Sequence, residues 1–178
     1  LAAEVKTEVV SPSIPNENTE IPKEVKNIGE IQGESHLSPL VGNKVIINNV
    51  IVTKKDKTGF YVQDKVSDNN PRTSDAVYVA SKENVVSKDN VEVGDLLKVQ
   101  GIVKEGYMEE YSVKEGQTFK TPAGSLTVTQ ITNVTITKLG TTDLPKPINI
   151  SGKMPKDIVD NTPTKYNSET EALDYWES

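Results

Sequence analysis

The chain has 178 residues, of which 34% are hydrophobic and only 5% aromatic, below the usual apolar share of a globular domain. We therefore expect one compact core, with the rest of the chain serving as linker. The absence of cysteine excludes disulfides, zinc–thiolate and iron–sulfur sites, and thiol nucleophiles. No apolar run approaches the roughly 20 residues that a membrane-spanning helix needs, so no membrane insertion is expected.

The formal net charge of −6 is unevenly distributed. Residues 40–140 hold 13 basic and 12 acidic side chains, whereas the flanks hold 7 and 14. A neutral centre argues against strong, non-specific nucleic-acid binding, because such binding depends on the release of counterions. The chain begins at Leu1 without a basic and apolar signal sequence, so we expect a mature product or an excised piece of a longer chain.

Residues 1–27 carry three prolines among Glu, Ser and Asn, a composition typical of an acidic linker or N-terminal extension. Val5, Val9 and Ile14 leave open the alternative that this segment lies as an extended strip on a neighbour. The residue composition changes at Ile28, where we place the start of a domain that extends to residue 145.

Within this domain the apolar pattern predicts five short strands and no sustained helical stripe. Polar turns separate them, and residues 81–92 suit a short helical turn or an irregular connection. A local bulge is expected at Asn48-Asn49, since Asn tolerates left-handed backbone geometry, and another bulge or a sharp bend is expected at Gly101. The predicted strands are Lys44–Thr53, Phe60–Asp64, Asp75–Ala80, Leu96–Lys104 and Ser125–Lys138.

Five strands, of which the first and fourth are bent, favour a small closed Greek-key barrel, because closure requires strong bending without loss of register. The turn Gly94-Asp95, followed by Val99, Gly101 and Val103, fits the fourth strand of an OB barrel. A β-sandwich is the competing fold, but it would require about seven strands. The predicted fold class is thus all-β, a five-stranded Greek-key OB-fold barrel with extended N- and C-terminal segments.

Residues 146–178 are expected to form an extended exit segment, since four prolines lie between positions 145 and 163. Ser168 and Glu171 have capping-box spacing and could begin a short terminal helix. Its Leu173, Tyr175 and Trp176 would need a surface to pack against, which indicates that the natural chain continues.

Several segments, taken in order, form a recognisable combination: Ile28–Leu40, Gly59–Asp64, Thr73–Val79, Val93-Gly-Asp95 with Val99 and Gly101, Leu144-Pro145 and Ala172–Ser178. Together they resemble the OB-fold module of bacterial extracellular nucleases, multidomain proteins with a catalytic domain of the endonuclease/exonuclease/phosphatase superfamily. The similarity covers about residues 28–178 and departs from the common pattern at Asn49, where Gly is frequent.

The resemblance implies a secreted or cell-wall-associated protein whose divalent metal and catalytic residues belong to a downstream domain. The fragment itself is therefore expected to have no catalytic residues, no metal site and no cofactor. The expected partners are nucleic acid, single-stranded or duplex and weakly bound, and the nuclease domain of the same chain.

Two other groups of polar residues have both a functional and a structural interpretation. His36 could act as a general base only with an orienting carboxylate, and Glu34 is the local candidate; a hydrogen bond that fixes the entry segment is the preferred interpretation. Asp64, Asp68, Asn70 and Asp75 carry the oxygen ligands that calcium prefers, but they match no complete EF-hand pattern. Asx-rich loops usually cap their own turns.

Strand parity predicts the ligand-binding surface. If the apolar residues face inward, Tyr61, Gln63, Tyr78, Lys98 and Lys104 lie outside. Aromatic rings interleaved with lysines form the platforms on which single strands stack. The two loops that flank the groove of an OB barrel would add Lys54, Lys55 and Lys57 from the first, and Tyr107, Tyr111, Lys114 and Lys120 from the long loop before the last strand.

The main hypothesis is a non-catalytic nucleic-acid-binding accessory module. The alternative is a structural or protein-interaction module that packs on the catalytic domain without binding nucleic acid. The acidic residues among the lysines favour this alternative. An oligosaccharide-binding barrel is a third option, allowed by the aromatic face but supported by no specific pattern.

Overall fold

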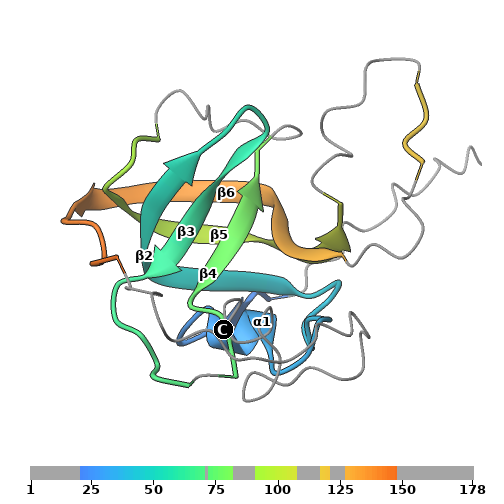
Figure 1. The fold of residues 1–178 in the computed structure, drawn as a ribbon, viewed down its shortest axis with the longest axis horizontal. Helices are drawn as coiled ribbons and strands as arrows, with labels where there is room; N and C mark the ends of the chain where they lie inside the picture. The colour runs from blue at the N-terminus through green and yellow to red at the C-terminus, as the bar shows by residue number, and fades with distance from the viewer. Residues whose placement is uncertain (1–20, 71, 82–90, 108–116, 121–126, 148–178) are drawn as a thin grey trace, which may run out of the picture.

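The computed structural model describes residues 21–70, 72–81, 91–107, 117–120 and 127–147. Within these ranges the chain is predominantly β, as predicted, with one short helix (Figure 1). The elements are β1 (Lys23–Glu24), α1 (Gly29–Gln32), β2 (Lys44–Lys55), β3 (Gly59–Asp64), β4 (Ala76–Ala80), β5 (Asp95–Gly106) and β6 (Val128–Thr141).

The strands form one sheet that closes on itself. β2 pairs with β3 along its second half and with β5 along its first half, both antiparallel. β3 pairs antiparallel with β4, β4 pairs parallel with β6, and β6 pairs antiparallel with β5. Hydrogen bonding therefore runs in a ring, β2–β3–β4–β6–β5 and back to β2, with β1 added in parallel beside β2.

A bulge bends β2 where the sequence predicted it. Ile47 pairs with Val99 and Val50 with Leu97, so β2 contains one extra residue between these pairs. Asn49 takes a φ of 60° there. The extra residue reverses the strand parity. The residues of β2 in the core are Val45 and Ile47 before the bulge and Val50 and Val52 after it, so β2 faces the core on both sides of the bend.

The bulge near Gly101 lies in the partner strand, β6, and not in β5. Gln100 pairs with Thr135 and Ile102 with Thr132, so the extra residue lies in β6, where Asn133 has a φ of 50°. Gly101 in β5 is the residue that faces the bulge. A Cβ at Gly101 would lie 2.6 Å from the Thr132 carbonyl oxygen, so the glycine gives the bulged chain room.

The ring encloses a single apolar core. Inward residues come from every strand of the ring and are at most 4% exposed. The core comprises Val45, Ile47, Val50, Val52, Phe60, Val62, Val77, Val79, Leu97, Val99, Val103, Ile131 and Val134 from the strands, with Val25, Ile28, Ile31 and Val91 from the connecting segments.

The segment that precedes β2 closes one end of this core. Ile28 and Ile31, one helical turn apart, are both fully buried, and Figure 1 shows α1 below the strands of the ring. Val25 is 4% exposed, and its amide donates to the Ile46 carbonyl at 2.9 Å. The packed body therefore begins before Ile28, within the stretch that composition alone marks as linker.

Candidate nucleic-acid interface

One row of outward side chains crosses all five strands of the ring. Lys54 of β2 is paired with Tyr61 of β3, Tyr61 with Tyr78 of β4, Tyr78 with Gln130 of β6, and Gln130 with Lys104 of β5. Neighbouring strands lie about 4.8 Å apart, so these side chains are direct neighbours around the ring. We call these five residues the cross-strand row. It brings together four of the predicted site residues and adds Gln130.

Tyr78 does not have the exposure expected of a stacking ring. Its parity is as predicted, since it points away from the core, but its side chain is only 1% exposed. A Cβ at Gly59 would lie 2.6 Å from the Tyr78 hydroxyl, so the missing side chain at Gly59 is what lets the ring lie flat across β3. The prediction that Tyr78 offers an open face to a base was therefore wrong.

The Tyr78 hydroxyl instead fixes the turn between β2 and β3. It donates to Asp56 Oδ1 at 3.1 Å and lies 2.7 Å from Thr58 Oγ1. The same carboxylate oxygen accepts from the backbone amides of Thr58 and Gly59, each at 2.8 Å. Asp56, one of the acidic residues among the lysines, is thus the acceptor that organises the turn.

The pKa values in this cluster follow from burial and hydrogen bonding. Burial tends to raise the pKa of Asp56, but the hydrogen bonds from Thr58, Tyr78 and Gly59 outweigh it and the net pKa lies below the usual value. Burial, together with the Asp56 charge, raises the pKa of Tyr78 and of Tyr61. Both phenols therefore stay neutral at physiological pH and the carboxylate stays charged.

Tyr61 is the ring of the row that remains partly exposed. Its centroid lies 5.1 Å from that of Tyr78, with the ring planes tilted by 59°. Lys54 Nζ lies 5.6 Å from the Tyr61 centroid, within the range of a cation–π contact. The Tyr61 ring and the Lys54 ammonium group are therefore adjacent on the outer surface, with the ammonium group over one face of the ring.

Lys54 and its neighbour Lys55 belong to β2 rather than to the turn. Among the described residues, the predicted lysines other than Lys54 and Lys104 lie apart from the row, and Lys55 forms an ion pair with Glu92 at 3.2 Å. Lys57 is exposed in the turn. Lys98 is half-buried on β5, where it is paired with Thr137.

The connection from β5 to β6 is described only in part. Tyr107 is half-buried, and its ring centroid lies 5.6 Å from that of Phe119. No sequence pattern indicated this pairing. Lys120 is exposed. Tyr111 and Lys114 lie outside the described residues, as do Leu173, Tyr175 and Trp176 of the exit segment.

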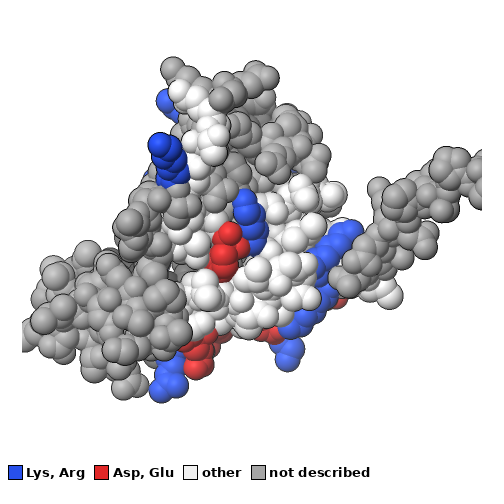
Figure 2. Space-filling model, turned by 90° about the vertical axis from the view of Figure 1, so that its right-hand side faces the viewer, with Lys and Arg blue, Asp and Glu red and all other residues white. Residues whose placement is uncertain are grey.

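Charge is mixed over the surface that the structure describes. On the face shown in Figure 2, acidic and basic side chains adjoin one another near the centre and along the lower edge. This agrees with the nearly neutral charge of residues 40–140. A ligand on this surface would gain little from long-range attraction and would depend on local contacts.

The acidic loop between β3 and β4 caps its own turns. Asp68 Oδ1 accepts from the Asn70 amide at 2.8 Å, and Asn70 Oδ1 accepts from the Arg72 amide at 3.1 Å. Asp64 Oδ2 accepts from the Ile28 amide at 2.7 Å. Within the described part of the chain, no group of three or more His, Cys, Asp or Glu residues is arranged to hold a metal ion.

His36 lies half-buried in the entry segment. Glu34, the carboxylate that would have to orient it, instead contacts Arg72 at 3.7 Å and the Asn70 side-chain amide at 3.5 Å. The Glu34 carboxylate is thus engaged with the β3–β4 loop, an arrangement that does not suit a general base and its orienting acid.

No protein-family model matches this chain, and no curated protein matches its sequence. The helix that the structure describes is too short to cross a membrane.

Proposed function

We propose that the chain is an OB-fold module that binds single-stranded nucleic acid weakly along the cross-strand row. It would serve as a non-catalytic accessory domain of a secreted or cell-wall-associated nuclease. The strand order of the ring supports the fold, because a closed five-stranded sheet with one parallel pair, β4–β6, is the arrangement expected of this barrel. The family resemblance supports the nuclease context.

The observation that carries the binding proposal is the placement of the row. Lys54, Tyr61 and Lys104 lie on one line around the outside of the ring, and the two lysines are its exposed ends. A ring that stacks on a base and lysines that meet phosphates are the components of a single-strand site. Since only Tyr61 is partly exposed, the site offers stacking for one base, and its affinity should be low.

Binding of a fluorescently labelled oligothymidylate at low salt, followed by anisotropy, tests this proposal. Tyr61→Ala should weaken binding by roughly 5- to 150-fold, since stacking on one ring contributes about 1–3 kcal/mol. Lys54→Ala and Lys104→Ala should each reduce the slope of log K against log salt by about 0.7. Lys65→Ala removes an exposed lysine that follows the opposite end of β3, and it should change neither the affinity nor the salt slope. Salt-insensitive binding, or none, would refute the proposal.

The structural alternative is favoured by the burial of Tyr78. A ring that is 1% exposed and bonded to a turn stabilises the barrel rather than a ligand. Under this alternative the module packs on the nuclease domain, and its deletion from the full-length protein leaves the KM for nucleic acid unchanged. Under the binding proposal, the KM rises on deletion because the local substrate concentration falls.

We also propose that this fragment lacks nuclease activity of its own. Incubation of the purified fragment with DNA or RNA and magnesium or calcium should give no turnover. Turnover that survives repurification would contradict the proposal.

A further inference from the structure

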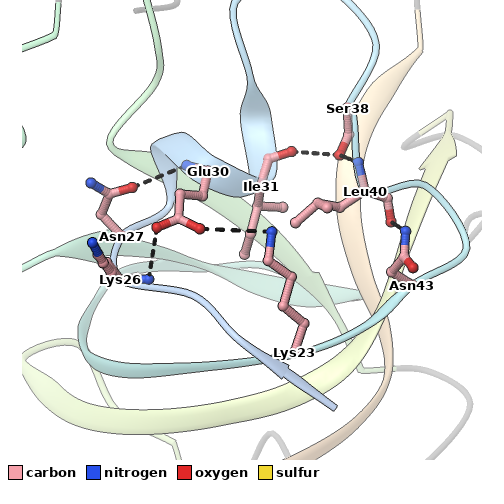
Figure 3. A network of polar contacts seen from close by, with 8 residues as sticks. All are labelled: Lys23, Lys26, Asn27, Glu30, Ile31, Ser38, Leu40 and Asn43. Atoms are coloured by element: carbon pink, nitrogen blue, oxygen red, sulfur yellow. Dashed lines mark hydrogen bonds and ion pairs between the residues drawn. The ribbon is translucent and has the colours of Figure 1, made fainter. Parts of the chain in front are cut away.

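The segment before β2, residues 21–43, is held together by its own polar contacts (Figure 3). Glu30 accepts from the Lys26 amide and contacts Lys23, while its amide donates to Asn27. Ser38 donates to the Ile31 carbonyl and accepts from the Leu40 amide. The segment therefore docks on the ring as a unit, through the buried side chains of Val25, Ile28 and Ile31 and through polar contacts to the ring.

One of these contacts is made to a buried carboxyl group. The Ile28 amide donates to Asp64 Oδ2 at 2.7 Å, across 36 residues of sequence, and Asp64 is only 8% exposed. Other polar attachments include the Gln32 side chain, which donates to the Ala76 carbonyl, the Ser38 amide, which donates to Glu105, and the Val25 amide, which donates to the Ile46 carbonyl. Glu34 also contacts Arg72 of the β3–β4 loop.

Two more carboxylates from the β3–β4 loop lie near Asp64. The charges of Asp75 and Asp68 both act on it. The loop and α1 are in close contact, because a Cβ at Gly29 would lie only 2.5 Å from Asp68 Oδ2. Asp75 Oδ1 accepts from the Asp68 amide at 3.4 Å, which holds the two loop carboxylates together.

Among the described residues, the charges that act on Asp64 are those of Asp75 and Asp68. Arg72, the basic residue of the β3–β4 loop, pairs with Glu34. The N-cap residue of α1 contributes the Ile28 amide, and Glu30 of α1 is engaged with Lys23 and with the Lys26 amide. β2 places Val50 opposite Asp64 in the sheet. None of the described ion pairs includes Asp64, Asp68 or Asp75.

We propose that Asp64 is a pH-sensitive latch, which holds the entry segment more tightly to the ring when its carboxyl group is protonated than when it is charged. Protonation removes the repulsion from Asp68 and Asp75. A carboxyl oxygen stays available to the Ile28 amide in either state.

The sign of the pH dependence follows from the linkage between docking of the entry segment and protonation of Asp64. Burial, with added repulsion from Asp75 and Asp68, raises the pKa of Asp64 to about 6, although the Ile28 hydrogen bond acts against this. A group whose pKa is higher in the docked state than in the open state favours docking at low pH, and this advantage is lost as pH rises through the docked-state pKa. With an open-state pKa near 3.9, docking should strengthen about tenfold between pH 7.5 and pH 5.0.

Amide hydrogen exchange of Ile28, followed by NMR and corrected for the intrinsic pH dependence of exchange, tests the latch. We expect its protection factor to rise about tenfold from pH 7.5 to pH 5.0. Asp64→Asn keeps an oxygen acceptor without the charge, so the protection factor should be independent of pH and at least as high at pH 7.5 as in the unmodified protein.

Two further variants keep the test decisive if Asp64→Asn fails to fold. Asp75→Asn keeps its Oδ1 acceptor and removes one repelling charge, so protection at pH 7.5 should rise and the pH dependence should weaken. Asp143→Asn, a change at an exposed acid, should leave the profile unaltered. Protection that falls or stays constant on acidification of the unmodified protein would overturn the proposal, as would an unchanged pH dependence in Asp64→Asn.

Discussion

Replacing Tyr78 with phenylalanine removes one hydroxyl group and leaves a ring of the same size in place. Two contacts are lost, one to Asp56 Oδ1 at 3.1 Å and one to Thr58 Oγ1 at 2.7 Å. A hydrogen bond to a charged group contributes about 1.5–3 kcal/mol to stability. Asp56 keeps its donors from Thr58 and Gly59, so we expect a loss toward the lower end, about 2 kcal/mol.

Urea denaturation at pH 7, followed by far-UV circular dichroism, measures this loss, and thermal melting should show a fall in Tm of roughly 5–10 °C. Tyr61→Phe is the matched control. The Tyr61 hydroxyl makes no hydrogen bond among those described, so its removal should change stability by less than about 0.5 kcal/mol.

The pH dependence of the difference supplies a second check. The pKa of Asp56 lies below its usual value in the folded state, so its contribution is present above the unfolded pKa, about 3.9, and is lost as pH falls through the folded value. The gap between the unmodified protein and Tyr78→Phe should therefore narrow below about pH 4. Equal stabilities of Tyr78→Phe and Tyr61→Phe at pH 7 would refute the assigned role of the Tyr78 hydroxyl.

Two further experiments, the first with a control variant, test the packing and the charges of the ring. Gly59→Ala places a Cβ 2.2 Å from the Val79 carbonyl oxygen and should cost about 3 kcal/mol or more in thermal denaturation. Gly42→Ala meets no atom within 4 Å and should cost only about 1–2 kcal/mol, from its φ of +82°; equal losses would contradict the packing argument. Lys138→Met removes the 2.7 Å ion pair with Asp95, whose carboxylate is buried, and should destabilise the fold by about 1–3 kcal/mol at pH 7. Burial tends to raise the pKa of Asp95, but the Lys138 and Glu92 hydrogen bonds lower it overall. In urea denaturation curves measured over a pH series, the stability lost in Lys138→Met should therefore disappear as pH falls below about 4.

Strand identity and strand parity could be predicted from the sequence because they depend on local residue order. Val and Ile at alternating positions mark the inward face, and an Asn pair interrupts this alternation where β2 bends. The last strand is shifted by three residues, since it begins at Val128 rather than Ser125 and ends at Thr141. Alternating Thr and Val continue across that boundary, so the pattern itself does not mark where pairing with β5 starts.

Exposure at the candidate site could not be predicted in the same way. Whether an outward ring is open depends on the residues paired with it in adjacent strands, and these are distant in sequence. Tyr78 is buried because its ring packs over Gly59 of the adjacent strand β3, where no side chain obstructs it, and because its hydroxyl reaches Asp56. The place of Gln130 in the row could not be predicted either, because it depends on the parallel pairing of β4 with β6.

The position of β6 has a consequence for how the chain is made. The last strand of the ring in sequence is inserted between β4 and β5, which pair with β6 but not with each other. During synthesis, the ring therefore stays open until residues after Val128 have left the ribosome. A nascent or truncated chain that ends earlier would expose two unpaired strand edges, a recognised template for aggregation. Expression of such truncations should yield insoluble protein even though most of the apolar core residues are already present.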